Sequence, residues 1–251
     1  MDFTNKRVLV TGGSRGIGFA VAKAFLDTGA FVAINGRTMQ TVGAAIDRLG
    51  GGERLVAAPA DIGTVPGCES AVKTAIDAFD GLDILVNSAG IGAGRPIEDC
   101  DEEMWDAHVD VNLKGTFFCC RAALSALRKS NGNIVNIASD AGLMGCIGIV
   151  VYCASKAGVV NMTRAMALEI APDVRVNCVC PGYVDTDMIR NSIEKAEDPS
   201  AKEQMMIDYA PLKRIAMPDE ISQAVLYLAS SEASFVTGAA LAIDGGTTAG
   251  R

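Results

Sequence analysis

Short apolar runs alternate with amphipathic stretches along the whole chain of 251 residues. The runs are rich in Val, Ile, Leu and Ala with little polar alternation, which is typical of strands covered on both faces. The predicted strands are Val8–Thr11, Phe31–Asn35, Arg54–Ala58, Ile84–Asn87, Asn133–Ile137, Arg175–Cys180 and Ala239–Ile243. The predicted helices between them are Gly16–Thr28, Thr38–Leu49, Val65–Phe79, Glu102–Ser130, Val151–Ile170 and Asp219–Ala229. Strands and helices that alternate in this way indicate right-handed βαβ units and a parallel sheet.

The first turn distinguishes between two folds that share this alternation, the eight-fold barrel and the open doubly wound sheet. Gly12, Gly16 and Gly18 follow the first strand and open the first helix. They permit a tight turn in which backbone N–H groups approach a pyrophosphate at the helix N-terminus. Their spacing, G-x-x-x-G-x-G, differs from the G-x-G-x-x-G of the long-chain dinucleotide fold. We therefore predict an α/β fold with a doubly wound, Rossmann-like parallel sheet of about seven strands, in a single domain spanning residues 1–251.

One segment interrupts the rhythm, starting at Tyr183 directly after the sixth predicted strand. It contains Pro199 and, up to Asp208, seven acidic residues against three basic ones. A long insertion at the carboxyl end of a parallel strand is a usual place for a substrate lid. We predict a lid over about residues 183–214; the alternative is a solvated pair of surface helices.

Composition narrows the class of protein further. The net charge of −8 argues against a nucleic-acid partner, whose phosphates require clustered Lys and Arg. No apolar run approaches the roughly 20 residues of a membrane span, and the polar start Met1–Arg7 lacks the apolar region of a signal peptide. The eight cysteines form no CxxC pair and show no zinc-ligand spacing, which favours reduced, mostly buried thiols over a metal or redox site. We expect a cytoplasmic protein with no metal site and no membrane partner.

The first turn also matches G-x-S-x-G, the nucleophile elbow of α/β-hydrolases, with Ser14 as the nucleophile. Such an enzyme needs a histidine further along the chain to act as base. The only histidine, His108, falls within an ordinary predicted helix, where an exposed or capping role is expected. The hydrolase hypothesis is therefore disfavoured.

Tyr152 and Lys156 lie four residues apart at the start of a predicted helix, so their side chains share one face. A nearby cation favours phenolate and is expected to lower the tyrosine pKa from about 10 toward neutrality. Such a tyrosine can give a proton to a carbonyl oxygen or take one from an alcohol. The alternative is an ordinary pair on an amphipathic helix face.

Several motifs in a fixed order resemble the short-chain dehydrogenase/reductase family over nearly the full length of the chain. They are Thr11–Gly18, Asn87–Gly90, Asn112, Ser139, Tyr152 with Lys156, and Pro181-Gly182. Ser88 departs from the family pattern, which commonly has asparagine there; because Asn87 is present, only local strand support is expected to change.

The resemblance implies four catalytic roles. Tyr152 would be the general acid/base, Ser139 would hydrogen-bond the substrate oxygen, Lys156 would bind the ribose hydroxyls and favour the phenolate, and Asn112 would hold a proton-relay water. Hydride would move between the substrate carbon and nicotinamide C4, a reaction that requires no metal.

The dinucleotide itself is expected to contact residues from several parts of the chain. Asp61 and Ile62 resemble the family's adenine contact, and Thr186 resembles its carboxamide contact; at a strand exit, either Asp or Thr is often only a cap. The expected cofactor contacts are Gly12, Ser14, Arg15, Gly16, Ile17, Gly18, Arg37, Asp61, Ile62, Asn87, Ala89, Gly90, Tyr152, Lys156, Pro181, Gly182, Val184 and Thr186.

The choice between NADP and NAD is read at the end of the second strand. An acidic residue there would bind the ribose 2′-hydroxyl of NAD, but by family alignment this position is Gly36. Arg37 follows it, and Arg15 of the first turn is expected nearby. Guanidinium groups match phosphate geometry, so we favour NADP. The alternative is NAD, with both arginines solvated.

The substrate is less determined. Acyl-carrier-protein reductases of the family commonly have basic residues at two stretches that here read Ser130–Asn133 and Ala171–Val174, neither of which contains arginine. We therefore favour a free small ketone or secondary alcohol over the alternative, a 3-oxoacyl-acyl-carrier-protein reductase. A non-catalytic NADP-binding regulator is an alternative of a different class.

Four apolar residues, Met144, Ile147, Ile149 and Val150, are expected either in a pocket wall or in the core. The resemblance also implies a homotetramer.

Overall fold

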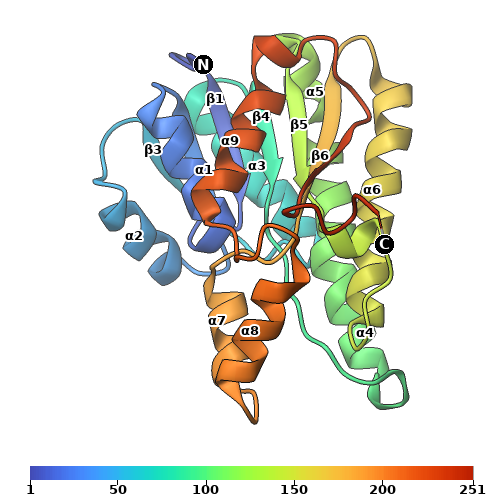
Figure 1. Cartoon of the computed structure of the whole chain (residues 1–251). Helices are drawn as coiled ribbons and strands as arrows, with labels where there is room; N and C mark the ends of the chain where they lie inside the picture. Colours follow the sequence, from blue (N-terminus) through green and yellow to red (C-terminus); the bar gives the residue numbers. More distant parts are fainter. Residues whose placement is uncertain (251) are drawn as a thin grey trace.

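The computed structural model describes residues 1–250 and contains one seven-stranded parallel sheet (Figure 1). The strand order is β3-β2-β1-β4-β5-β6-β7. The chain adds β2 and β3 on one side of β1 and then returns to add β4 to β7 on the other side. This is the open, doubly wound sheet that the first turn predicted, in one Rossmann-like domain, and the barrel is excluded. The strands are β1 (Arg7–Thr11), β2 (Phe31–Gly36), β3 (Leu55–Pro59), β4 (Ile84–Asn87), β5 (Asn133–Ile137), β6 (Arg175–Pro181) and β7 (Ala240–Ile243).

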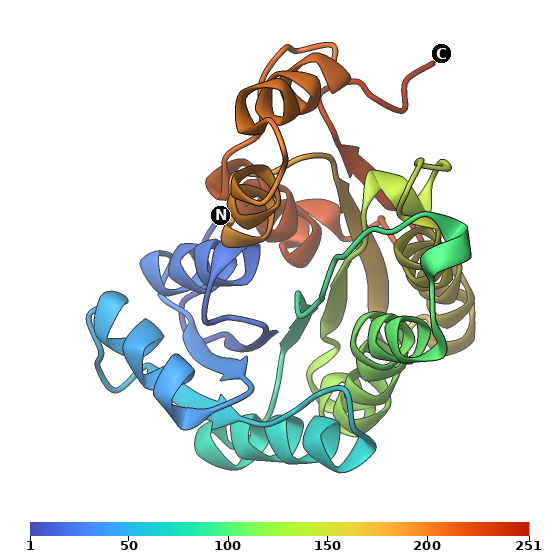
Figure 2. The ribbon, with the colours of Figure 1, turned by 90° about the horizontal axis from the view of Figure 1, so that it is seen from below.

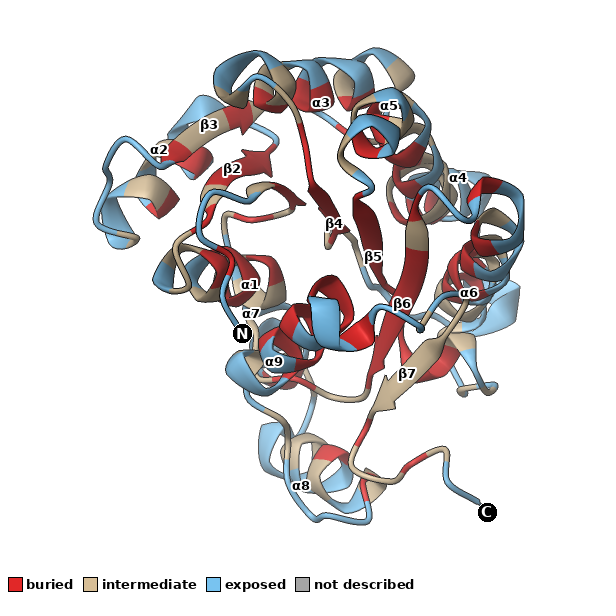
Figure 3. Cartoon of the chain, turned by 90° about the horizontal axis from the view of Figure 1, so that it is seen from above, coloured by how far each residue is buried: buried red, intermediate tan, exposed pale blue. Residues whose placement is uncertain are grey.

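Helices cover both faces of the sheet, which is why the central strands are buried along almost their whole length (Figure 3). Val8 and Val10 of β1 face a core shared with helices α1, α2 and α9, whereas Leu9 faces a core shared with α3, α5 and α6. The helices of the first face are α1 (Gly16–Asp27), α2 (Met39–Arg48) and α9 (Pro218–Ala229). Those of the second face are α3 (Val65–Phe79), α5 (Gly115–Ser130) and α6 (Val150–Ile170).

The segment predicted as one helix, Glu102–Ser130, has a different structure. It forms α4 (Glu102–His108), a π-helical turn (Val109–Lys114) and then α5. A Cβ atom at Gly115 would collide with the Ile62 carbonyl oxygen, so α5 starts in close contact with the segment that follows β3. The π-helical turn contains the buried Asn112, and turns of this kind often occur at functional sites.

The segment after β6 forms two helices, α7 (Asp187–Glu194) and α8 (Pro199–Tyr209), which project beyond the carboxyl ends of the strands (Figure 1). Arg190 of α7 pairs with Asp185 and with Glu203 of α8, so one guanidinium joins the two helices to the end of β6.

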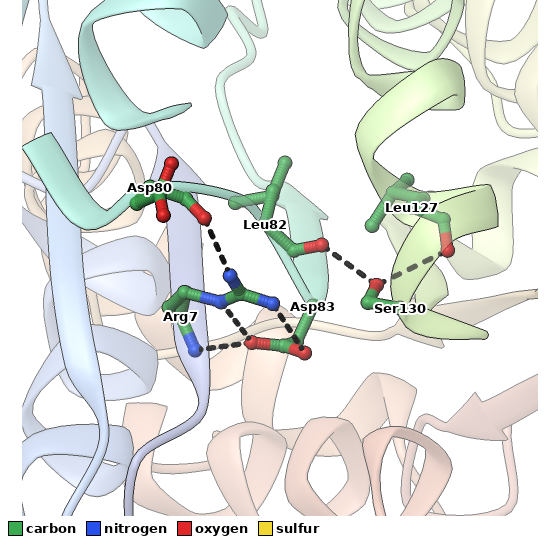
Figure 4. A network of polar contacts seen from close by, with 6 residues as sticks. All are labelled: Arg7, Asp80, Leu82, Asp83, Leu127 and Ser130. Carbon is green, nitrogen blue, oxygen red and sulfur yellow. Dashed lines mark hydrogen bonds and ion pairs between the residues drawn. The ribbon is translucent and has the colours of Figure 1, made fainter. Parts of the chain in front are cut away.

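The opposite edge of the sheet is held by an ion pair between β1 and the segment before β4 (Figure 4). Arg7 Nε donates to Asp83 Oδ2 at 2.7 Å, and the Arg7 backbone N–H donates to the same oxygen at 2.9 Å. A second guanidinium nitrogen donates to the Asp80 carbonyl oxygen at 2.7 Å. This network lies far from the carboxyl edge, so its contribution is to stability.

All eight cysteines are unpaired, and five are buried, which confirms the prediction of mostly buried thiols. Within residues 1–250 there is no group of three or more His, Cys, Asp or Glu side chains placed to hold a metal ion. Over the same residues, none of the helices combines the length and apolar character that crossing a membrane requires.

Candidate active site

The glycine-rich turn between β1 and α1 lies at the carboxyl edge of the sheet, onto which Figure 2 looks. Gly12 and Gly16 have positive φ angles of 64° and 54°, a conformation that favours glycine. A Cβ atom at Gly12 would lie 2.7 Å from Ala89 Cα, and one at Gly18 would collide with the Gly12 carbonyl oxygen. The turn is therefore packed as closely as glycine permits at the N-terminus of α1. This cradle fits the pyrophosphate of a dinucleotide.

Two exposed arginines stand at the ends of β1 and β2. Arg15 precedes α1 and Arg37 follows Gly36, and neither guanidinium has a hydrogen-bond or ion-pair partner within residues 1–250. A Cβ atom at Gly36 would lie 3.0 Å from Val42 Cγ2 and 3.2 Å from Ser14 Oγ. An acidic side chain at this position would have little room.

The end of β4 is fastened to its neighbour β1 through Thr11. The Thr11 hydroxyl oxygen accepts hydrogen bonds from the backbone N–H groups of Ser88 and Ala89, at 3.1 and 3.2 Å. Asn87 Nδ2 donates to Asn136 Oδ1 of β5 at 2.9 Å. Because Ser88 takes part through its main chain, the departure from asparagine leaves this support in place.

Tyr152 and Lys156 share one face of α6, with Lys156 Nζ 5.7 Å from the centroid of the tyrosine ring. The lysine is only 4% exposed, and its ammonium group donates to the Ile137 carbonyl oxygen at 2.8 Å. Ser139 lies just beyond the end of β5, close enough to Tyr152 to influence the pKa of its hydroxyl. A Cβ atom at Gly90 would lie 3.5 Å from Lys156 Nζ, so glycine keeps space open beside the lysine.

The pKa values of this pair differ from the sequence-based prediction. Burial raises the pKa of Tyr152 to about 12; the hydrogen bond with Ser139 opposes this effect, and the charge of Asp140 strengthens it. Burial likewise lowers the pKa of Lys156 to about 8. The prediction that the lysine brings the tyrosine pKa toward neutrality is therefore wrong for the chain alone, because loss of hydration on burial is the largest effect on the tyrosine hydroxyl.

Asn112 connects the loop after β4 to the helix that carries Tyr152. Its side-chain oxygen accepts from the Ile91 N–H at 2.8 Å, and its amide donates to the Ile91 carbonyl and to Ser155 Oγ, both at 3.0 Å. Ser155 in turn donates to the Tyr152 carbonyl oxygen at 2.8 Å. Both amide hydrogens of Asn112 are used. A proton-relay water there would therefore have to donate to the side-chain oxygen or the main-chain carbonyl oxygen of Asn112.

His108 is buried, not exposed or capping, which corrects the sequence-based prediction. It is 2% exposed, and its ring lies 6.4 Å from the Tyr152 ring, centroid to centroid. Nδ1 is 2.8 Å from the Met104 carbonyl oxygen, which can only accept, and Nε2 is 3.2 Å from the Ala93 N–H, which can only donate. These two partners assign the neutral ring with its hydrogen on Nδ1. With Nε2 committed to the Ala93 loop, His108 does not act as base for Ser14, and the hydrolase hypothesis is rejected.

The remaining expected cofactor contacts differ in their surroundings. Asp61 Oδ1 accepts from the Gly63 N–H at 3.0 Å, a local turn contact, and Ile62 is buried in the core. Thr186 precedes α7 and would lie 3.3 Å from a Cβ atom at Gly16, which brings the segment after β6 close to the first turn. The others lie along the same edge: Ile17 and Val184 against the core, and Pro181 and Gly182 at the end of β6.

Asp140 is a site residue that the sequence analysis missed. It follows Ser139, is 7% exposed, and its Oδ1 accepts from Ser139 Oγ at 2.9 Å and from the Ala141 N–H at 2.7 Å. Burial raises the pKa of its carboxyl, against the effect of these two hydrogen bonds, and the charge of Asp244 raises it further. A single sequence offers no periodic or spacing signal for a buried acid of this kind.

Comparison with known proteins agrees with this geometry. A family model described as enoyl-(acyl carrier protein) reductase matches residues 12–248. The chain belongs to the short-chain dehydrogenase/reductase family. It is 39% identical to (2S)-[(R)-hydroxy(phenyl)methyl]succinyl-CoA dehydrogenase subunit BbsD of Thauera aromatica, over 98% of each chain. It is 35% identical to the 3-oxoacyl-[acyl-carrier-protein] reductase FabG of Chlamydia trachomatis, over 96% of this chain and 97% of that protein. The crystal structure of a putative short-chain alcohol dehydrogenase from Sinorhizobium meliloti matches with a TM-score of 0.91 and 38% identity, over 100% of this chain and 99% of that one. Members of the short-chain dehydrogenase/reductase family are oxidoreductases that bind NAD(P), and the chain is therefore an oxidoreductase of this kind.

Proposed function

We propose that the protein interconverts a ketone and a secondary alcohol with a nicotinamide cofactor, using Tyr152 as general acid/base. The observation that carries the proposal is the convergence of Ser139, Tyr152 and Lys156 beside the glycine-rich turn, from β5 and α6. The bound nicotinamide would supply or accept the hydride. The protein's part is to hold the substrate oxygen and to move one proton.

Each of the four polar residues has a defined part in this reaction. The Tyr152 hydroxyl gives its proton to the carbonyl oxygen during reduction and takes it back during oxidation. Ser139 hydrogen-bonds the same oxygen; its own proton is directed to Asp140 in the chain alone, so a carbonyl substrate must draw it away. Lys156 holds the ribose hydroxyls through the space that Gly90 leaves open, and its charge favours phenolate. Asn112 positions the helix of Tyr152 and accepts from the relay water.

The two unpaired guanidinium groups support NADP as the preferred cofactor. Arg15 and Arg37 have no carboxylate partner within residues 1–250, and Gly36 leaves little room for an acid. A 2′-phosphate at this place would provide the missing partner. Comparing kcat/KM for NADPH and NADH tests the assignment, and a clear preference for NADH would refute it.

Helices α7 and α8, within about residues 183–214, are the proposed lid. The sulfur of Met188 in α7 would lie 3.0 Å from a Cβ atom at Gly92, and Tyr152 would lie 3.6 Å from the same atom. The lid therefore reaches the neighbourhood of the reacting tyrosine, where closing it would exclude water. Of the four apolar residues expected in a pocket wall or in the core, none is buried, which favours the wall.

A free ketone or secondary alcohol remains the preferred substrate over an acyl-carrier-protein thioester. The two stretches that would bear docking arginines lie at the amino ends of β5 and β6, opposite the reacting residues. Arg128, just before the first stretch, pairs with Asp173 of the second at 3.5 Å, so its charge is already compensated. The 3-oxoacyl-acyl-carrier-protein reductase stays the alternative, because a relative with that activity is 35% identical.

Substituting Tyr152→Phe tests the proposed reaction. The variant lacks the proton that the substrate oxygen needs, so turnover should fall at least about 100-fold, the size of a typical acid/base contribution. Cofactor binding, followed by nicotinamide fluorescence, should stay within a few-fold of the wild type. Unchanged turnover would refute the role of Tyr152. A wild type that binds NADPH and reduces no ketone would favour the regulator instead.

We also propose a homotetramer in the cytoplasm. Phe117 on α5 and Leu168 on α6 are exposed apolar residues, 42% and 85% accessible, on the two helices expected to meet a neighbouring subunit. Eight unpaired cysteines fit a reducing compartment. Light scattering coupled to gel filtration tests the assembly, and a monomer would refute it.

A further inference from the structure

Asp140 has one carboxylate oxygen more than its structural role requires. Oδ1 alone accepts the hydrogen bonds from Ser139 Oγ and from the Ala141 N–H, which together shape the short 3₁₀ turn Asp140–Gly142. Oδ2 has no hydrogen-bond partner within residues 1–250. It is also not enclosed, since the side-chain oxygens of the described residues that are both enclosed and unpartnered are Asn87 Oδ1 and Asn133 Oδ1. A neutral asparagine would serve the turn equally well, so the second oxygen and its charge call for another explanation.

The surroundings of Asp140 include the reacting tyrosine and the proposed lid. The Asp140 charge acts on side chains from the loop after β5, from α6, from the loop after β6 and from α8. These side chains are Cys146, Tyr152, Tyr183 and Tyr209. The rings of Tyr183 and Tyr209 pack edge to face with centroids 5.3 Å apart, and Cys146 Sγ lies 3.5 Å from the Tyr209 hydroxyl. The charge of Asp140 therefore acts both on the reacting tyrosine and on residues of the proposed lid.

We propose that Asp140 determines substrate specificity by binding, through Oδ2, a hydroxyl group on the carbon next to the reacting carbon. The inference rests on the proposed function, since it uses the position of the substrate oxygen between Ser139 and Tyr152. Asp140 and Ser139 are hydrogen-bonded neighbours, so Oδ2 lies close to the place of the reacting oxygen. In a hydroxy ketone or a vicinal diol, the second oxygen also lies about one hydrogen-bond length from the first. A substrate of this class thus presents its two oxygens to Tyr152 and Asp140 together.

The charge pattern disfavours an anionic group at this position. A carboxylate or phosphate on the neighbouring carbon would be repelled by Asp140 and by Asp244 behind it. An ammonium group would bind only the ionised carboxyl. A hydroxyl group binds both forms, because it donates to a carboxylate and accepts from a carboxylic acid. A methyl group in place of the hydroxyl would cover Oδ2 and leave a nearly buried acceptor without a donor.

The test compares ketones that differ only by hydroxyl against methyl at the neighbouring carbon. Suitable pairs are 3-hydroxy-2-butanone with 3-methyl-2-butanone, 2-hydroxycyclohexanone with 2-methylcyclohexanone, and 2-hydroxy-1-phenylpropan-1-one with 2-methyl-1-phenylpropan-1-one. We expect the wild type to favour the hydroxy ketone in kcat/KM by roughly 10- to 100-fold, the size of a hydrogen bond to a charged group. In Asp140→Asn this ratio should fall about tenfold toward one, because the amide replaces a hydrogen bond to a charged group by a weaker neutral one.

Asp244→Asn is the matched control, because it removes an equal charge from the same neighbourhood. Both oxygens of Asp244 are used within its own turn, by the Gly246 N–H and by the N–H and hydroxyl of Thr248. The wild-type ratio should therefore persist in this variant. If the ratio falls equally in the two variants, the preference arises from the negative charge of the region and not from a direct contact with Asp140. That result would overturn the inference.

The outcomes separate this inference from the proposed function. If the wild type reduces both members of each pair equally well, the proposed function stands and the role of Asp140 is refuted. This outcome does not depend on whether Asp140→Asn folds. A wild type that binds NADPH and reduces no ketone of any pair refutes the proposed function, and the inference with it. In the oxidation direction, a higher kcat/KM for 3-amino-2-butanol than for 2,3-butanediol would overturn the assignment to a hydroxyl group.

Discussion

Replacing Lys156 by methionine is expected to make the protein more stable while abolishing its proposed activity. Lys156 is 4% exposed, and its ammonium group has one protein hydrogen bond, to the Ile137 carbonyl oxygen. Burial lowers its pKa from 10.5 to about 8, so the folded chain holds this charge at a penalty. Methionine has a similar length and no charge, and it removes the penalty without leaving a large cavity.

The magnitude follows from the two pKa values. At about 1.4 kcal/mol per pH unit, a fall from 10.5 to about 8 corresponds to about 3 kcal/mol of destabilisation when both the folded and the unfolded chain are protonated. The lost hydrogen bond leaves the Ile137 carbonyl without this donor, at a cost of about 1–2 kcal/mol. The net gain of Lys156→Met is therefore about 1–2 kcal/mol near pH 7, or a few degrees in Tm for a chain of this size.

The pH dependence gives the sharper test. Below about pH 8 the wild type carries the full penalty. Between about pH 8 and 10.5 the folded lysine loses its proton while the unfolded one keeps it, so the unfolded state binds more protons and wild-type stability rises with pH. The advantage of Lys156→Met should shrink and then reverse over this range.

Urea unfolding of both proteins without cofactor, from pH 6.5 to 10, measures this difference. Lys73→Met, at an exposed lysine paired with Asp77, is the control and should stay within about 0.5 kcal/mol of the wild type at pH 7. The reasoning is refuted if Lys156→Met is less stable than the wild type at pH 7, or if the difference between them does not change up to pH 10.

Three further predictions concern other parts of the chain. Gly18→Ala should raise the NADPH Kd at least roughly tenfold in a fluorescence titration, since its Cβ collides with the backbone of the turn; Gly43→Ala, with open space around its Cβ, is the control, and equal affinities would contradict the cradle. Arg37→Ala should lower the kcat/KM ratio of NADPH to NADH about tenfold, and an unchanged ratio would rule out a phosphate contact. Asp83→Ala should lose about 2–3 kcal/mol of stability in thermal unfolding at pH 7, because it strands a mostly buried guanidinium, whereas the exposed Asp27→Ala should lose less than about 0.5 kcal/mol. Burial tends to raise the pKa of Asp83, but the hydrogen bonds from Arg7 outweigh it and lower this pKa, so the contribution is present above about pH 4 and is lost as the pH falls further; a wild-type advantage that stays constant below pH 4 would contradict the assignment.

The sequence by itself determined the sheet and the helix face that Tyr152 and Lys156 share. All seven predicted strands agree with the structure to within one residue at either end, because strands buried on both faces form apolar runs that a local window detects. The glycines of the first turn selected the doubly wound sheet, since close approach of backbone to backbone excludes every larger side chain. The four-residue spacing of Tyr152 and Lys156 fixed their common face for the same local reason.

Only the tertiary structure decided how these groups are hydrated and paired. Segments distant in the chain cover Tyr152 and Lys156, and the resulting burial moves both pKa values in directions that a pair on an isolated helix would not show. His108 became a buried neutral ring because the loop after β4 folds back onto it. Asp140 acquired one occupied and one free oxygen through the turn that Ser139 begins. Periodicity and spacing are local properties of a sequence, whereas hydration and pairing depend on which distant segments meet, and the structure alone supplies that.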